Sequence, residues 1–358
     1  MLAPVIDKSP AELFTDRMTQ ILNDAGLALM ISVGHRTRLF DVMSTRAAWT
    51  AVDLAESAIL SERYVREWLG AMVTGGIVTF DERLQRYALP AAHAASLTRA
   101  ASPNNIAVTT QWISVLGGAE DAIVKAFAHG RGVPYSEYAR FHEVMAEESQ
   151  QTVVAALQQH ILPLVAGLTD RLQSGITVLD VACGSGRAML ELAEAFPASH
   201  FTGVDASVEA ITVADEAAAR RRTANTRFVK GDMAELDTPR AYDLVTAFDA
   251  IHDQAKPVVV LERIHAALKP GGVFLMQDIL GHTHLADNIG SPLAPFMYTI
   301  SCMHCMSVSL AAGGPGLGAM WGRERALEML AAAGFRDVRV ETLPHDPINY
   351  YYLASKQQ

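Results

Sequence analysis

The sequence predicts an α/β protein in which a Rossmann-like, mostly parallel sheet ends in an antiparallel hairpin and follows an α-rich N-terminal half. From Ile176 onward, short apolar runs alternate with helical patterns. The first run, Ile176–Val181, is nearly continuous, as in a strand buried on both faces, and it stops at the glycine turn Gly184–Gly186. The last two strand candidates, Val338–Leu343 and Ile348–Ala354, are joined by a link too short for a crossover helix, so they must pair antiparallel.

Composition limits the classes of protein to consider. The 358 residues, half of them apolar, suffice for two domains with a large core. The net charge of −10 argues against general affinity for nucleic acid or for an anionic membrane. No apolar run approaches the ~20 residues that cross a bilayer, and Met1–Pro10 lacks the basic and apolar blocks of a secretory signal. Cys183, Cys302 and Cys305 form no disulfide framework, which fits a reducing compartment. Together these observations lead us to expect a cytoplasmic protein with no membrane partner.

Residues 1–100 have the pattern of a winged helix-turn-helix. The expected elements are helices over 11–43, from 51 and over 64–73, and short strands over 77–80 and 86–89. Ser61 is the expected N-cap of the third helix. The would-be recognition stretch Ser61–Leu69 carries two arginines and two glutamates, whereas DNA readers present a basic surface. We therefore expect a dimerising domain and a homodimer, and do not expect DNA as a partner.

Residues 101–174 are predicted to be a helical linker that also lines a substrate pocket. Four ring-bearing residues share one face of a helix or of its approach: Tyr135, Tyr138, Phe141 and His142. Such stripes are usually core, but a tyrosine-rich face with a histidine equally fits a pocket wall, and both readings stay open. Tyr135, Tyr138 and His142 are therefore candidate acceptor-binding residues.

The last domain is expected over residues 175–358, after a further apolar helix over Val153–Leu168. Its expected strands cover 178–181, 201–204, 227–229, 244–248 and 273–277, with helices over 207–222 and 258–268.

The neighbours of the glycine turn indicate its ligand. A dinucleotide-binding turn would need a third glycine or alanine where Met189 stands, which disfavours NAD without excluding it. Asp205 lies 19 residues after Gly186, where a carboxylate can bind ribose hydroxyls. Asp232 can accept a hydrogen bond from an adenine amino group, and Met233 can pack on the ring.

Acidic residues lie near the carboxyl ends of four expected strands: Asp180, Asp205, Asp232 and, after Phe248, Asp249. Because carboxylates at one rim would repel a phosphate, this cluster favours a cationic ligand.

Four motifs together resemble those of class I S-adenosylmethionine-dependent methyltransferases. They are Asp-Val-Ala-Cys-Gly-Ser-Gly at 180–186, Gly-Val-Asp at 203–205, Gly-Asp at 231–232 and Lys-Pro-Gly-Gly at 269–272. The terminal hairpin also resembles the end of that family's seven-stranded sheet. The resemblance implies S-adenosylmethionine as cofactor and S-adenosylhomocysteine as its product. It implies that Gly184 and Gly186 face the methionine part, Asp205 the ribose, and Asp232 and Met233 the adenine.

The winged-helix half before such a domain resembles dimeric small-molecule O-methyltransferases and an actinobacterial-type winged-helix group. The O-methyltransferases carry a catalytic histidine after the fourth strand in a Leu-His-Asp-Trp-like stretch, which matches Ala250–Gln254 here, with Gln254 in place of the Trp. The resemblance implies a catalytic His252, and the near-neutral pKa of histidine suits a general base. The alternative is that His252 only hydrogen-bonds the substrate or caps a helix. Asp278, at the end of the fifth strand, could orient the substrate or His252.

Cys302, His304 and Cys305 lie near His282 and His284 in the sequence, and four such side chains could in principle bind zinc. A single Cys-x-x-Cys pair is weak support, so we expect no metal. We expect the Met-rich stretch Met297–Met306 instead to line an acceptor pocket, with Met303 and His304 as candidate substrate-binding residues.

We therefore expect a metal-independent methyltransferase that acts on a hydroxyl or thiol of a small molecule. Three alternatives remain. An N- or thioether-methyltransferase would need no base, a winged-helix transcriptional regulator would only sense S-adenosylmethionine, and a reductase would use NAD.

Overall fold

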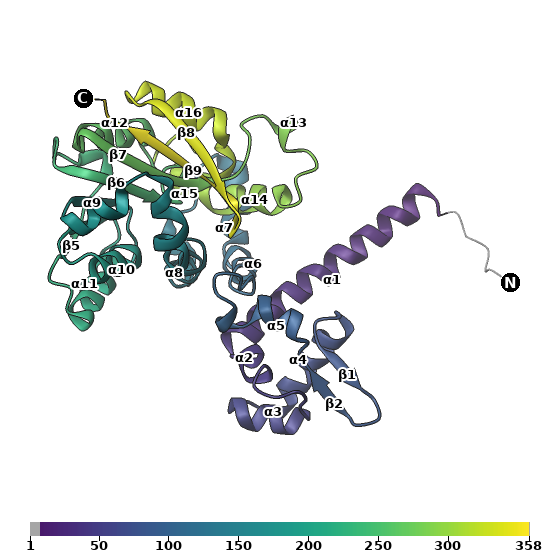
Figure 1. Ribbon diagram of the computed structural model, residues 1–358. Coiled ribbons are helices and arrows are strands. Elements are labelled where there is room, and N and C mark those ends of the chain that lie inside the picture. Colours follow the sequence, from purple (N-terminus) through teal and green to yellow (C-terminus); the bar gives the residue numbers. More distant parts are fainter. Residues whose placement is uncertain (1–7, 358) are drawn as a thin grey trace. The chain divides into compact units, whose positions relative to one another are not determined.

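The computed structural model describes residues 8–357, which divide into two compact units, one up to Ser114 and one from Val115 (Figure 1). We describe each unit by itself. The predicted boundaries at residues 100 and 174 stay predictions.

The N-terminal unit is a winged helix. Its elements are α1 (Pro10–Arg36), α2 (Leu39–Met43), α3 (Ala51–Ala58), α4 (Glu62–Thr74), β1 (Thr79–Asp81), β2 (Arg86–Ala88), α5 (Ala91–Leu97) and η1 (Arg99–Ala101). Helix α6 (Gln111–Gly117) crosses the boundary between the units. The apolar faces of these helices meet in one core around Trp49, Trp68 and Met72. Ser61 precedes α4, as predicted, but its side chain makes no capping hydrogen bond.

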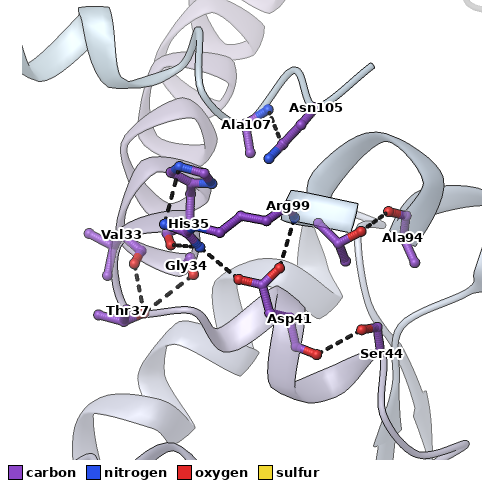
Figure 2. A network of polar contacts seen from close by, with 11 residues as sticks. Val33, Gly34, His35, Thr37, Asp41, Ser44, Ala94, Arg99, Asn105 and Ala107 are labelled. Carbon is purple, nitrogen blue, oxygen red and sulfur yellow. Dashed lines mark hydrogen bonds and ion pairs between the residues drawn. The ribbon is translucent and has the colours of Figure 1, made fainter. Parts of the chain in front are cut away.

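A polar network ties three segments of this unit together (Figure 2). The Arg99 guanidinium donates to Asp41 Oδ2 at 2.6 Å and to the His35 carbonyl at 2.9 Å, and the Arg99 backbone N–H donates to Asp41 Oδ1 at 2.8 Å. The end of α1, helix α2 and the 3₁₀ turn η1 are therefore held by one arginine.

The second unit begins with helical segments that precede its sheet. They are α7 (Glu120–His129), η2 (Tyr135–Glu137), α8 (Phe141–Thr152), η3 (Val154–Ala156), η4 (Leu157–Ile161), η5 (Leu162–Leu164) and α9 (Leu168–Ser174). The continuous helix expected over Val153–Leu168 is wrong. The chain forms a 3₁₀ turn, a π turn and a second 3₁₀ turn there, because Pro163 lacks the backbone N–H that a regular helix would use.

The sheet has seven strands in the order β5-β4-β3-β6-β7-β9-β8. They are β3 (Thr177–Val181), β4 (His200–Asp205), β5 (Thr226–Lys230), β6 (Tyr242–Phe248), β7 (Leu268–Ile279), β8 (Arg336–Leu343) and β9 (Asp346–Ser355). The first five are parallel, while β9 pairs antiparallel with both β7 and β8. The predicted terminal hairpin is confirmed, and its second strand, β9, lies between β7 and β8 in the sheet.

Helices cover both faces of this sheet (Figure 1). The helices after β3 are α10 (Arg187–Ala195), α11 (Val208–Arg221), α12 (Pro257–Ala267), α13 (Leu285–Asn288), α14 (Ala294–Ile300), α15 (Met306–Ala311) and α16 (Gly322–Ala332), of which α10, α11, α12 and α16 pack on the sheet. Short turns η6 (Met233–Glu235), η7 (Ser301–Cys305) and η8 (Ala319–Trp321) lie between them. One apolar layer joins α10 and α11 to the sheet, and a second joins α12 and α16 to its other face.

Among residues 8–357, no single helix combines the length and hydropathy needed to span a membrane. One pair of segments bent by 107°, Phe141–Leu164 with Leu168–Ser174, passes the test by length and composition only.

Candidate active site

The two glycines of the turn after β3 have different surroundings. Both have positive φ, +53° at Gly184 and +71° at Gly186. A Cβ on Gly186 would lie 2.4 Å from the Phe228 ring, so this position needs glycine for packing. A Cβ on Gly184 would have no atom within 4 Å, so this glycine faces open space. Gly184 is therefore the one that a ligand can approach.

Asp205, at the end of β4, fixes the glycine turn. Its Oδ2 accepts the Gly184 N–H at 2.8 Å, and its Oδ1 accepts the Ser207 N–H at 2.8 Å. Because each carboxylate oxygen has two lone pairs, both oxygens can still accept a hydrogen bond from a hydroxyl group. This arrangement suits the predicted binding of two ribose hydroxyls.

Asp180 lies in β3, near the carboxyl end of the strand. Its side chain is buried, and Thr246 on β6 donates to its Oδ1 at 2.6 Å. Burial raises its pKa to about 7, although the Thr246 hydrogen bond lowers it. Asp180 is therefore ionised only in part near neutral pH.

Asp232 and Met233 follow β5, as predicted. Asp232 is exposed, and its Oδ1 caps η6 by accepting the Ala234 N–H at 2.8 Å. Met233 is buried in the apolar layer under the sheet rim. The Asp232 carboxylate is therefore exposed to solvent next to the buried, apolar side chain of Met233.

Asp249 follows the half-buried Phe248 and adopts a positive φ of +50°. Its Oδ1 is buried with no hydrogen-bond partner among the described residues. Burial and the neighbouring Asp278 raise the pKa of Asp249 well above the usual range of a carboxyl group.

His252 and Asp278 form a buried pair. The His252 Nδ1 lies 2.7 Å from Asp278 Oδ1, which also accepts the Trp321 Nε1–H at 2.9 Å and the Ile279 N–H at 2.8 Å. Because a carboxylate only accepts, Nδ1 carries a hydrogen, which leaves Nε2 as the other functional nitrogen.

Asp253 stands on the opposite side of the His252 ring. Its Oδ1 lies 3.3 Å from His252 Nε2, and its Oδ2 accepts the Tyr135 hydroxyl at 2.9 Å. Burial lowers the pKa of His252, but the two carboxylates outweigh it and hold that pKa well above its ordinary value.

His304 is packed among aromatic rings. It stacks on Phe141 at a centroid distance of 4.3 Å and meets Tyr138 and Tyr135 edge-on at 4.8 and 5.2 Å. Burial lowers its pKa to about 4, even with Asp253 nearby, so its ring is neutral at pH 7.

The π turn η7 sets the position of this wall. The Tyr138 hydroxyl donates to the Met303 carbonyl within η7, and the exposed His142 stacks on Tyr135 at 6.5 Å. The structure thus gathers the predicted substrate residues Tyr135, Tyr138, His142, Met303 and His304. Irregular π turns are frequent at functional sites.

The zinc set considered from the sequence does not come together among residues 8–357. His282 bonds Glu324 at 2.8 Å, while Cys305 lies with His252 and Asp253, whose polar side-chain atoms and the Cys305 sulfur are within 4.8 Å of one another. Sequence reasoning missed the positions of Asp253, Cys305 and Trp321. Asp253 stood in the quoted His-Asp stretch, which was the one signal available.

Two family models match the chain. Residues 25–99 match the Rv2258c-like winged HTH domain, and residues 172–334 match the methyltransferase domain. These matches confirm the predicted winged helix and the predicted methyltransferase domain, while the predicted domain boundaries stay predictions.

Solved structures of the same fold cover nearly all of the chain. A Nostoc punctiforme protein provisionally assigned as an O-methyltransferase has a TM-score of 0.71 at 21% identity over 98% of this chain and 99% of that one. Human N-acetylserotonin methyltransferase, solved with S-adenosylmethionine, has a TM-score of 0.71 at 18% identity, over 99% of this chain and 100% of that one.

Curated relatives match a shorter stretch. A demethylmenaquinone methyltransferase of Listeria monocytogenes is 33% identical over 104 residues, which are 28% of this chain and 44% of that protein. A sterol 24-C-methyltransferase of Gibberella zeae is 34% identical over 121 residues, 33% of this chain and 30% of that protein. The chain thus spans less than half the length of these relatives.

Proposed function

We propose that this chain, whose residues 25–99 belong to the Rv2258c-like winged HTH family and whose residues 172–334 belong to the methyltransferase domain family, methylates a small molecule. The methyl donor is S-adenosylmethionine, and the acceptor is a hydroxyl or a thiol. The observation that carries the proposal is the His252–Asp278 pair just beyond the strand that borders the glycine turn.

The residues at the sheet rim fit the cofactor. The open face of Gly184, the lone pairs of Asp205 and the exposed carboxylate of Asp232 offer contacts to the methionine, ribose and adenine parts, with Met233 beneath. When bound, the cofactor supplies a methyl group on a cationic sulfur. An acid-rich rim favours such a charge.

His252 is the proposed general base. Its Nδ1 is held by Asp278, so Nε2 is the nitrogen that receives a proton. Alignment of the acceptor and exclusion of water are the other requirements of this displacement. The ring wall of Tyr138, His142 and His304 supports both. An amine or thioether acceptor would need no base, and nothing in the geometry favours it.

The surface charges and exposed apolar side chains of the N-terminal unit favour dimerisation over DNA binding. On α4, Arg63 pairs with Glu67 and Arg66 pairs with Glu62, so its arginines are already neutralised. Helix α1 instead exposes an apolar stripe: Leu13, Phe14, Met18, Ile21, Leu22, Leu29 and Val33. A homodimer in the cytoplasm is therefore part of the proposal.

The test is transfer of a tritium-labelled methyl group to a panel of phenols, thiols and amines, with calorimetry of S-adenosylhomocysteine and NAD. We expect S-adenosylhomocysteine to bind, NAD not to bind, and label to enter phenols or thiols. Binding without transfer to any acceptor, combined with a DNA mobility shift at low salt, would favour the sensor.

A further inference from the structure

Three side chains of types that bind metal ions meet at the histidine proposed as the base. One ligand atom each of His252, Asp253 and Cys305 lies within 4.8 Å of the other two. His252 Nε2 and Asp253 Oδ1 are 3.3 Å apart, and the Cys305 thiol hydrogen-bonds both side chains. Only Cys305 also belongs to the zinc set considered from the sequence, so the fold assembles a different set of ligands.

The spacing and the ligand types fit one kind of ion. Because Zn²⁺ holds nitrogen and oxygen ligands at about 2.0–2.1 Å, two such ligands lie about 3.3 Å apart in a tetrahedral site. Imidazole, carboxylate and thiolate are all zinc ligands, whereas Mg²⁺ and Ca²⁺ prefer oxygen ligands. The three side chains supply three tetrahedral positions and leave the fourth to water.

Neighbouring residues orient two of the ligands. His252 Nδ1 donates to Asp278 Oδ1 at 2.7 Å, which directs Nε2 toward the cluster. The Tyr135 hydroxyl donates to Asp253 Oδ2 at 2.9 Å, which leaves Oδ1 on the side of the histidine. Metal-binding histidines usually donate their other ring N–H to a carboxylate, and ligating carboxylates are themselves hydrogen-bonded. His252 and Cys305 are buried, while the side chain of Asp253 is 11% exposed and marks the side by which an ion enters.

We propose that His252, Asp253 and Cys305 bind Zn²⁺ and that the bound ion inhibits methyl transfer. Binding joins the metal to Nε2, Oδ1 and the cysteine sulfur, and the thiol proton and any proton on Nε2 pass to the buffer. Zn²⁺ keeps its charge, so the step needs no oxidant or reductant. The inhibition, but not the binding, rests on the proposed function, because the ion occupies the nitrogen that receives the acceptor's proton.

Cobalt substitution tests the binding. Untagged protein freed of metal with a chelator should gain a near-ultraviolet band of thiolate-to-metal charge transfer when equimolar Co²⁺ is added, and Zn²⁺ should remove that band. Cys305→Ser should lose the band and bind Zn²⁺ about 100-fold more weakly in competition with a chromophoric chelator. Asp278→Asn, which removes an outer partner, should weaken Zn²⁺ binding about tenfold. The matched control is Cys302→Ser, a part-exposed cysteine of the same turn η7, which should keep both the band and the affinity.

Circular dichroism checks that each variant is folded. Equal Zn²⁺ affinity in the wild type and Cys305→Ser, loss of the cobalt band in Cys302→Ser, or no binding by the wild type would overturn the site. Zn²⁺ should inhibit methyl transfer by the wild type at the concentration that fills the site, and transfer that continues with the site filled would overturn the inhibition. If the wild type transfers no methyl group to any acceptor, the proposed function fails, and the cobalt band and the Zn²⁺ affinities alone decide the metal site.

Discussion

His252 and Asp278 form the innermost contact of the candidate site, with Nδ1 and Oδ1 2.7 Å apart. Trp321 donates to the same carboxylate oxygen at 2.9 Å, so the contact couples the end of β7 to the turn η8. Because Asp278 is fully buried, its charge acts on His252 with little screening by water. The pair therefore fixes both the orientation and the protonation of the imidazole.

The first prediction is a pH profile displaced to alkaline pH. Since Asp278 and Asp253 hold the pKa of His252 well above its usual 6.5, kcat/KM should rise with pH through that raised pKa and not near 6.5. Asp278→Asn removes one charge that raises the pKa, so the limb should move to lower pH while the maximum rate falls about 100-fold. Rate measurements between pH 6 and 10 check this. If kcat/KM rises at the same pH in the wild type and in Asp278→Asn, Asp278 does not set the pKa of His252.

The same pKa shift also affects folding. A histidine whose pKa is raised in the folded state stabilises the fold fully below its unfolded pKa, and this contribution is lost as pH rises through the folded pKa. Urea unfolding should therefore show a loss of stability at alkaline pH that is smaller in Asp278→Asn.

The two glycines of the turn should respond differently to alanine. Gly186→Ala places a Cβ 2.4 Å from Phe228 at positive φ, so we expect about 2–4 kcal/mol of lost stability. Gly184→Ala meets no atom within 4 Å and should cost only about 1–2 kcal/mol for its φ.

Ligand affinity separates these variants further. Because Gly184 faces the open side of the turn, Gly184→Ala should weaken S-adenosylhomocysteine binding at least tenfold in calorimetry. Unchanged affinity in a folded Gly184→Ala protein would argue against contact between this glycine and the ligand.

Most of the sheet could be predicted because buried strands leave continuous apolar runs, and the order of strands along the chain follows from those runs. The helix predicted over Val153–Leu168 failed because apolar spacing does not register the backbone effect of Pro163. The contact between Tyr135 and Asp253 joins residues 118 positions apart, so no local pattern could reveal it. The acids at the strand ends were predictable because strand direction alone brings them to one rim.

The arginine network of the winged helix leads to a stability prediction. Arg99→Ala removes the side-chain hydrogen bonds to Asp41 Oδ2, to the His35 carbonyl and to His35 Nε2, and leaves Asp41 with one donor, the Arg99 backbone N–H. We expect a loss of about 1–2 kcal/mol, since both side chains are part-exposed and solvent screens the ion pair. The readout is the unfolding transition of the N-terminal unit followed by tryptophan fluorescence.

A matched control uses Arg63, whose ion pair with Glu67 is mostly exposed on α4. Arg63→Ala should change stability by less than about 0.5 kcal/mol. Equal effects of the two substitutions would show that the Asp41–Arg99 contact has no special structural role.

The apolar stripe of α1 leads to the last prediction. Leu22 is 71% exposed within the stripe, and burial of such side chains against a second copy is the simplest source of a dimer. Leu22→Glu should therefore convert a dimer to a monomer or weaken it at least tenfold, as measured by sedimentation. Leu84→Glu is the control, because Leu84 is 63% exposed in the loop between β1 and β2, away from the stripe. A wild-type protein that is monomeric at all concentrations, or a dimer that withstands Leu22→Glu, assigns the stripe no role in self-association.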